Sequence, residues 1–104
     1  MIPTDRRPTH PGTMLREMYL KPRDVTLTAF SEATGISRKH LSRLANGHVS
    51  VTPEVAMKLA AALETTPELW LNAQRNVDLF DARQDLSDWS PTRVFEPEMS
   101  TPPD

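Results

Sequence analysis

The sequence predicts an all-α fold of five helices that ends in an extended tail. Apolar residues recur at three- and four-residue spacing from Pro11 to about Arg83, and good capping residues precede most of these stretches. No stretch favours a strand, and no internal repeat is visible. Because 104 residues have room for a single hydrophobic core, we expect one domain.

The first helix is predicted from Pro11 to Leu20, after the opening His10-Pro11-Gly12. Pro22 ends it, because the residue before a proline disfavours helical backbone. Methionines at helical spacing are interpreted as core residues, including one in a later helix: Met14, Met18 and Met57. Leu15 and Tyr19 complete the expected apolar face.

The second helix is predicted from Leu27 to Thr34 and the third from Arg38 to Ala45. Thr26 and Ser37 are good N-caps for them, and Gly35 allows a tight exit from the second helix. The pair Asn46-Gly47 tolerates left-handed backbone and closes the third helix. The side chains expected to face inward are Leu27, Phe30, Ala33, Leu41 and Leu44.

The last two helices share one pattern of start, Thr52-Pro53-Glu54 and Thr66-Pro67-Glu68. Each places a capping hydroxyl, then a proline at the first helical position, then an acid near the positive end of the helix. They predict helices from Pro53 to Leu63 and from Pro67 to about Arg83. Glu64 follows the fourth helix, where a glycine is more comfortable. The expected core residues are Val55, Ala56, Leu59, Ala60, Leu63, Leu69, Trp70, Ala73, Val77 and Phe80.

These boundaries divide the chain into three parts. Residues 1–9 are interpreted as a flexible basic arm, residues 10–84 as the helical domain, and residues 85–104 as an extended or disordered tail. The tail has four prolines and five acids, although Trp89, Val94 and Phe95 are apolar enough to dock it.

Charge is distributed unevenly along the chain, although the net charge is only -2. Residues 1–52 hold eight Lys/Arg and four Asp/Glu, which gives +4, whereas residues 53–104 hold four and ten, which gives -6. Because phosphate responds to local potential, the first half is the candidate DNA-binding side.

Several classes of function are disfavoured. The chain has no cysteine, no nucleophile beside a base and no glycine-rich phosphate loop, so we expect no enzyme and no cofactor. His10, His40 and His48 lack partners at ligand spacing, so no metal is expected. Without a membrane-spanning run or a secretory leader, the expected location is the cytoplasm.

The stretch FSEATGISRKHLSRLANG, residues 30–47, has the parts of a helix-turn-helix motif. Phe30, Ile36, Leu41 and Leu44 anchor it, and Gly35 lies at the turn. In this motif the second helix enters the major groove with its N-terminal residues near base edges. The predicted base-reading residues are Ser37, Lys39, His40 and Arg43, and the predicted phosphate contacts are Arg38, Ser42, Asn46 and His48. The competing interpretation is a merely solvated basic helix face.

The chain resembles the HigA family of antitoxins, also called virulence-associated or plasmid-maintenance antidote proteins. This family lies within the Xre-type helix-turn-helix group, whose domain is lambda-repressor-like. The resemblance spans about Arg7 to Arg83. It rests on four segments, RPTHPGTMLREMYLKP, the motif above, VTPEVAMKLAAALETTPELWLNAQ and NVDLFDAR. Departures from the family pattern are Thr13, Asp24-Val25 and Glu64.

The resemblance implies an antitoxin of a type II toxin-antitoxin system. Such a protein forms a homodimer, represses its operon at a palindromic operator and neutralises a HigB-like mRNA endonuclease. Surplus apolar residues on the fifth helix favour a dimer, with the proposed interface on Trp70, Ala73, Val77 and Phe80. The alternative is that the tail covers this surface within one chain.

Two other functions stay open. One is a free-standing Xre-type transcriptional regulator. The absence of a toxin gene beside this one would favour that function. The other is a toxin-binding inhibitor that no longer binds DNA. The intact set of Lys39, His40 and Arg43 argues against the second.

Overall fold

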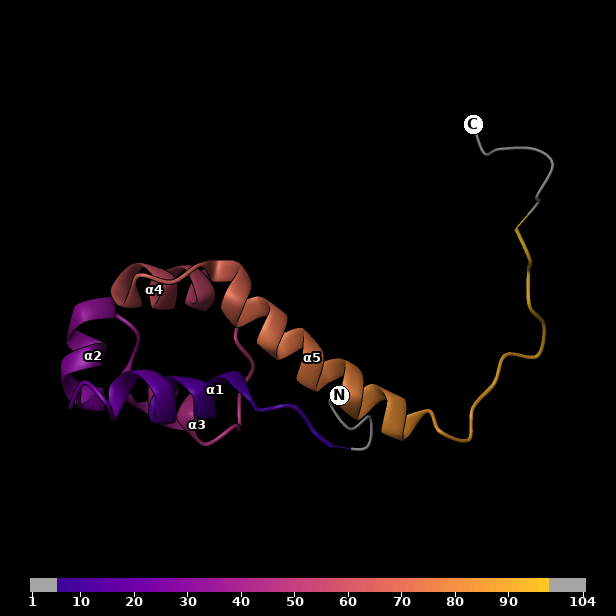
Figure 1. The fold of residues 1–104 in the computed structure, drawn as a ribbon, viewed down its shortest axis with the longest axis horizontal. Coiled ribbons are helices and arrows are strands. Elements are labelled where there is room, and N and C mark those ends of the chain that lie inside the picture. The colour runs from indigo at the N-terminus through magenta and orange to yellow at the C-terminus, as the bar shows by residue number, and fades with distance from the viewer. Residues whose placement is uncertain (1–5, 98–104) are drawn as a thin grey trace.

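The computed structural model describes residues 6–97, which form a helical body followed by a protruding helix and tail (Figure 1). Figure 1 shows α1 to α4 gathered together, with α5 running away from them. The described residues contain no strand. The elements in chain order are α1 (Pro11–Met14), η1 (Leu15–Leu20), α2 (Leu27–Thr34), α3 (Arg38–Ala45), α4 (Pro53–Leu63) and α5 (Pro67–Asp85).

Four helices begin where their capping residues predict. The hydroxyls of Thr26, Ser37, Thr52 and Thr66 each accept a hydrogen bond from the backbone N–H three residues later, at 3.0 to 3.3 Å. This bond satisfies an N–H that has no partner within its helix. The predicted bounds of α2, α3 and α4 are confirmed, and α5 ends two residues after the predicted end.

A histidine caps α1. His10 is buried, and its Nδ1 accepts a hydrogen bond from the Gly12 N–H at 2.9 Å. Burial lowers the pKa of His10, the Arg7 charge lowers it further, and Asp78 and Asp81 act in the opposite direction. The fold therefore favours the neutral imidazole, which is the form that can accept this bond.

The segment η1 continues α1 with wider turns than the predicted α-helix. Residues five apart are bonded here, as in the 3.0 Å bond from the Lys21 N–H to the Arg16 carbonyl. Five-residue spacing places Leu15 and Leu20 on the buried side. The core position predicted for Met18 is wrong, because the wider turn leaves this side chain 63% exposed.

Two further core predictions are wrong. Met57 is 64% exposed, since α4 buries the side formed by Val55, Ala56, Leu59 and Ala60. Ala33 is also exposed and lines a shallow groove between α2 and the end of α4. Glu64 has the left-handed backbone conformation that the sequence indicated, with φ of 55°.

Trp70 lies at the centre of the core and is fully buried. Its Nε1–H donates to Thr65 Oγ1 at 2.8 Å, and its ring packs on that of Tyr19 with centroids 5.2 Å apart. One turn further along α5, the Gln74 Oε1 accepts a bond from the Val51 N–H at 2.9 Å. The first half of α5 thus contacts η1, the loop after α4 and the loop after α3.

Gly12 packs directly on the backbone of α3. A Cβ atom at this position would lie 1.6 Å from the Leu44 carbonyl oxygen and 2.6 Å from the Leu44 carbonyl carbon. No side chain fits there unless the backbone moves. Only glycine allows α1 and α3 to approach this closely.

We expect Gly12→Ala to lower the free energy of unfolding by at least about 2 kcal/mol, because the added methyl group forces α1 away from α3. Chemical denaturation followed by circular dichroism measures this change. Thr13→Ala is the matched control and should change stability much less. Equal stability of Gly12→Ala and the wild type would contradict the close packing.

Candidate nucleic-acid interface

The turn between α2 and α3 is held by side-chain hydrogen bonds as well as by glycine. Gly35 ends α2 with φ of 78°, a left-handed value that favours glycine. Ser31 Oγ donates to the Ile36 carbonyl at 2.6 Å. Thr34 Oγ1 donates to the Phe30 carbonyl at 2.8 Å and accepts from the Ile36 N–H at 3.2 Å. These bonds fix the angle between the two helices.

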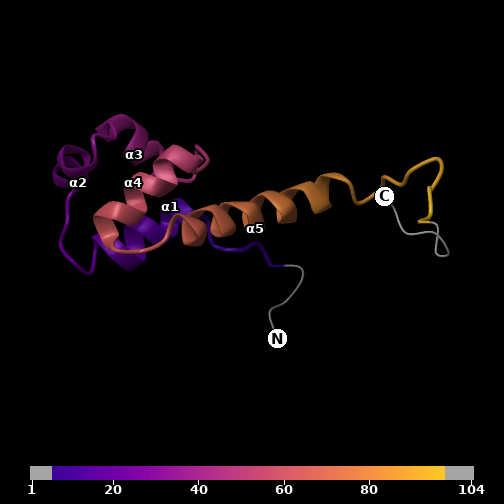
Figure 2. The same cartoon turned by 90° about the horizontal axis from the view of Figure 1, so that it is seen from above.

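The two sides of α3 differ in burial. Its inward side, formed by Leu41, Leu44 and Ala45, is buried against the rest of the body. Figure 2 shows α2 and α3 at one edge of the body, with α5 running away from them. Six of the eight predicted DNA-contacting residues are exposed at this edge: Ser37, Arg38, Lys39, Arg43, Asn46 and His48.

The remaining two predicted contacts, His40 and Ser42, are only partly exposed. His40 Nε2 is buried and has no hydrogen-bond partner in the described structure. This position lies beside Leu41, at the border between the two sides of α3. The expectation that His40 reads bases therefore needs correction for this nitrogen, which does not reach the surface.

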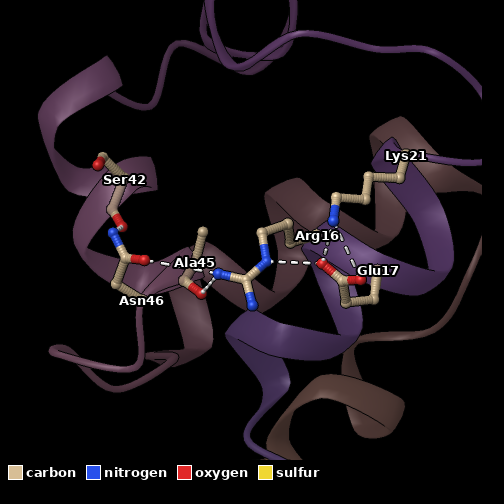
Figure 3. A network of polar contacts seen from close by, with 6 residues as sticks. All are labelled: Arg16, Glu17, Lys21, Ser42, Ala45 and Asn46. Carbon is tan, nitrogen blue, oxygen red and sulfur yellow. Dashed lines mark hydrogen bonds and ion pairs between the residues drawn. The ribbon is translucent and has the colours of Figure 1, made fainter.

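A polar network joins η1 to the end of α3 (Figure 3). Arg16 Nη1 donates to the Ala45 carbonyl at 3.0 Å and lies 3.5 Å from Asn46 Oδ1. Asn46 Nδ2 donates to the Ser42 carbonyl at 2.9 Å. No sequence pattern indicates this role for Arg16, because its partners lie 29 and 30 residues away.

Glu17 holds the other side of the Arg16 guanidinium. Its carboxylate pairs with Arg16 Nε at 2.8 Å and with Lys21 Nζ at 2.9 Å. Hydrogen bonds from Lys21 and then Arg16 lower the pKa of Glu17. The carboxylate therefore stays charged and keeps the guanidinium directed at α3.

The described part of the N-terminal arm contacts α5. The Arg7 guanidinium makes two hydrogen bonds of 2.9 Å to the Asp81 carboxylate. This pair raises the pKa of Arg7 and lowers that of Asp81. In this structure Arg7 thus lies along α5 and not beside α3. Residues 1–5 of the predicted flexible arm lie outside the described part of the chain.

The predicted dimer surface is corrected at two positions. Trp70 and Val77 are 0% and 1% exposed within a single chain, because this side of α5 packs on the chain's own core. A second copy cannot cover them. Ala73 and Phe80 are partly exposed, and Leu79 is 43% exposed.

The tail does not cover α5 in the described structure. Trp89, Val94 and Phe95 are all exposed, and Figure 1 shows the chain leading away from α5. The Arg93 guanidinium lies 4.4 Å from the centre of the Phe95 ring, a contact within the tail itself. The apolar residues of the second half of α5 are therefore left open to another molecule. Residues 98–104 of the tail are not described.

Other kinds of site find little support within residues 6–97. No group of three or more potential metal ligands occurs there. None of the helices in this range is both long and apolar enough to cross a membrane.

The fold and the exposed basic side of α3 define a helix-turn-helix protein. A model of the helix-turn-helix family matches residues 15–70, more than half of the chain. The antitoxin HigA-1 of Vibrio cholerae serotype O1 is 51% identical over 83 residues, which cover 80% of this chain and 78% of the relative. The chain belongs to the HigA family of helix-turn-helix antitoxins.

Solved structures agree with this assignment. Antitoxin GraA has a TM-score of 0.76 and 35% sequence identity, over 80% of this chain and 89% of its own. A structure of antitoxin GraA in complex with its operator has a TM-score of 0.79 and 31% identity, over 92% and 100% of the two chains. The predicted lambda-repressor-like, Xre-type fold is thereby confirmed.

Proposed function

We propose that this protein is an operator-binding antitoxin that acts as a homodimer, represses its own operon and neutralises a HigB-like mRNA endonuclease. One observation carries the DNA-binding part, namely the exposed basic side of α3, which lies at the edge of the body after a hydrogen-bonded glycine turn. The solved GraA complex with its operator supports the same use of this fold.

In this proposal the side chains of α3 make two kinds of DNA contact, to bases and to phosphates. Ser37, Lys39 and Arg43 read base edges. Arg43 is suited to a guanine, whose O6 and N7 accept two hydrogen bonds from one guanidinium. The flanking contacts to phosphate come from Arg38, Ser42, Asn46 and His48.

We expect Arg43→Ala to weaken operator binding by roughly 1 to 3 kcal/mol, which is about fivefold to a hundredfold, because it removes a base contact. Gel shifts with a duplex from upstream of the chain's own reading frame measure the dissociation constant. Thermal stability should not change, since Arg43 is exposed. Arg75→Ala removes the same charge from exposed α5 and should bind like the wild type. Unchanged affinity in Arg43→Ala would refute α3 as the reading helix.

Dimerisation is supported by the apolar residues that one chain leaves uncovered. Ala73, Leu79 and Phe80 lie on α5, which protrudes from the body and offers them to a second copy (Figure 1). A two-fold dimer would place two copies of α3 in successive major grooves, roughly 34 to 36 Å apart. This spacing is the geometric requirement for a palindromic operator.

We expect Leu79→Asp to shift the protein from dimer to monomer, because a charge in an apolar contact between copies is strongly unfavourable. Sedimentation velocity at several concentrations measures this shift. The matched control is Met57→Asp, which places the same charge at an exposed methionine of α4. A monomer produced by Met57→Asp and a dimer retained by Leu79→Asp would place the interface on α4 instead.

Toxin neutralisation is supported by the close relationship to the antitoxin HigA-1. Two surfaces are candidates for binding a cationic ribonuclease. The first is the N-terminal arm with α1. The second is the acidic second half of α5 with the tail, where Asp78 and Asp85 are exposed.

Co-expression with the toxin encoded beside the gene should restore growth that the toxin alone arrests. A chain that ends at Asp85 removes the tail but keeps α5. Lost protection assigns toxin binding to the tail, whereas retained protection excludes the tail and leaves the arm with α1 and the acidic residues of α5. If the neighbouring gene encodes no toxin and the intact chain gives no protection, the remaining function is that of a transcriptional regulator.

A further inference from the structure

We propose that Arg16 is a positioning residue for the phosphate-facing end of α3, an inference that rests on the proposed DNA binding. Arg16 lies outside the helix-turn-helix motif, on η1. It nevertheless bonds to the last residue of α3 and contacts the next one (Figure 3). Its role is to orient Asn46, which we place among the phosphate contacts.

The first part of the argument concerns the end of α3. The last carbonyls of a helix have no partner within the helix and need an outside donor. Arg16 Nη1 supplies one to the Ala45 carbonyl at 3.0 Å. A cation near the C-terminal end of a helix is also favoured by the helix dipole. Arg16 therefore fixes where α3 ends relative to η1.

The second part concerns the Asn46 amide. Its Nδ2 donates one hydrogen to the Ser42 carbonyl, and its Oδ1 faces Arg16 Nη1. A side-chain amide nitrogen carries two hydrogens, so one N–H remains for an outside acceptor. The side chain is exposed, which leaves this N–H accessible to a phosphate oxygen. Without Arg16, Oδ1 loses its partner and the amide is free to turn its acceptor outward.

The third part concerns charge. Arg16 is paired with Glu17, which also pairs with Lys21, so its charge is partly compensated within the protein. Its Nε and Nη1 donors are both used inside the chain. In contrast to a residue that neutralises a phosphate, a positioning residue leaves the salt dependence of binding unchanged when it is lost.

The test compares Arg16→Gln with Arg23→Gln in operator binding. Arg23 is a matched control, because it is exposed and also donates to a backbone carbonyl, that of Tyr19 at 3.2 Å, but makes no hydrogen bond to α3. The probe is the duplex from upstream of the reading frame. We expect Arg16→Gln to bind about tenfold more weakly, through one weakened hydrogen bond in each of two half-sites. Arg23→Gln should bind like the wild type.

Two further readouts separate positioning from other roles. The slope of log affinity against log salt should be the same for Arg16→Gln and the wild type. In a double-mutant cycle, Arg16→Gln should add almost nothing to the loss caused by Asn46→Ala, because both changes disable the same contact. A shallower slope would make Arg16 a direct phosphate contact. Additive losses would make the two residues independent, and either result would overturn the inference.

Folding is checked by circular dichroism. If Arg16→Gln does not fold, Arg16→Lys replaces it in the same cycle. Lysine keeps the charge but lacks the guanidinium group, which bonds to Glu17 and to the Ala45 carbonyl at the same time. If the wild type binds the duplex and the Arg16 variants bind it with the same affinity, the inference alone is refuted. No binding by the wild type would refute the proposed function and the inference with it.

Discussion

The contact between Gly12 and the Leu44 backbone is the constraint on which the rest of the structure depends. It sets the distance between the start of α1 and the end of α3, and nothing larger than glycine fits between them. His10 caps α1 directly before this contact, and its ring lies 3.8 Å from where a Cβ of Gly47 would be. Arg16 then reaches the end of α3 one turn later. These contacts fix the position of α3 relative to α1 and η1, and with it the position of its exposed side.

Local signals explain why so much of the fold was predictable. Capping by Thr26, Ser37, Thr52 and Thr66 involves residues three apart, so the sequence alone locates these helix starts. The left-handed conformations of Gly35 and Glu64 follow equally from their positions at helix ends. The exposed basic residues of α3 were predictable for the same reason, since Leu41 and Leu44 define its buried side.

Contacts between distant residues explain what was missed. The wide turns of η1 expose Met18, and no spacing rule for an α-helix anticipates them. The sequence predicts a dimer interface at Trp70 and Val77, because apolar residues on one helix do not reveal which partner covers them. The chain's own core does so here. Arg16 was missed because its bond to Ala45 exists only after folding brings η1 to α3.

The separation of charge along the chain supports different roles for the two ends of the molecule in the proposed function. Arg38, Lys39 and Arg43 lie at the edge formed by α3, while Asp78 and Asp81 lie on α5. Titration of the isotope-labelled chain with operator duplex, followed by NMR of the backbone amides, tests this division most directly. The amide shifts should change most from Ser37 to His48 and hardly at all from Asp78 to Asp85. Large changes on α5 with α3 unaffected would contradict DNA recognition by the helix-turn-helix.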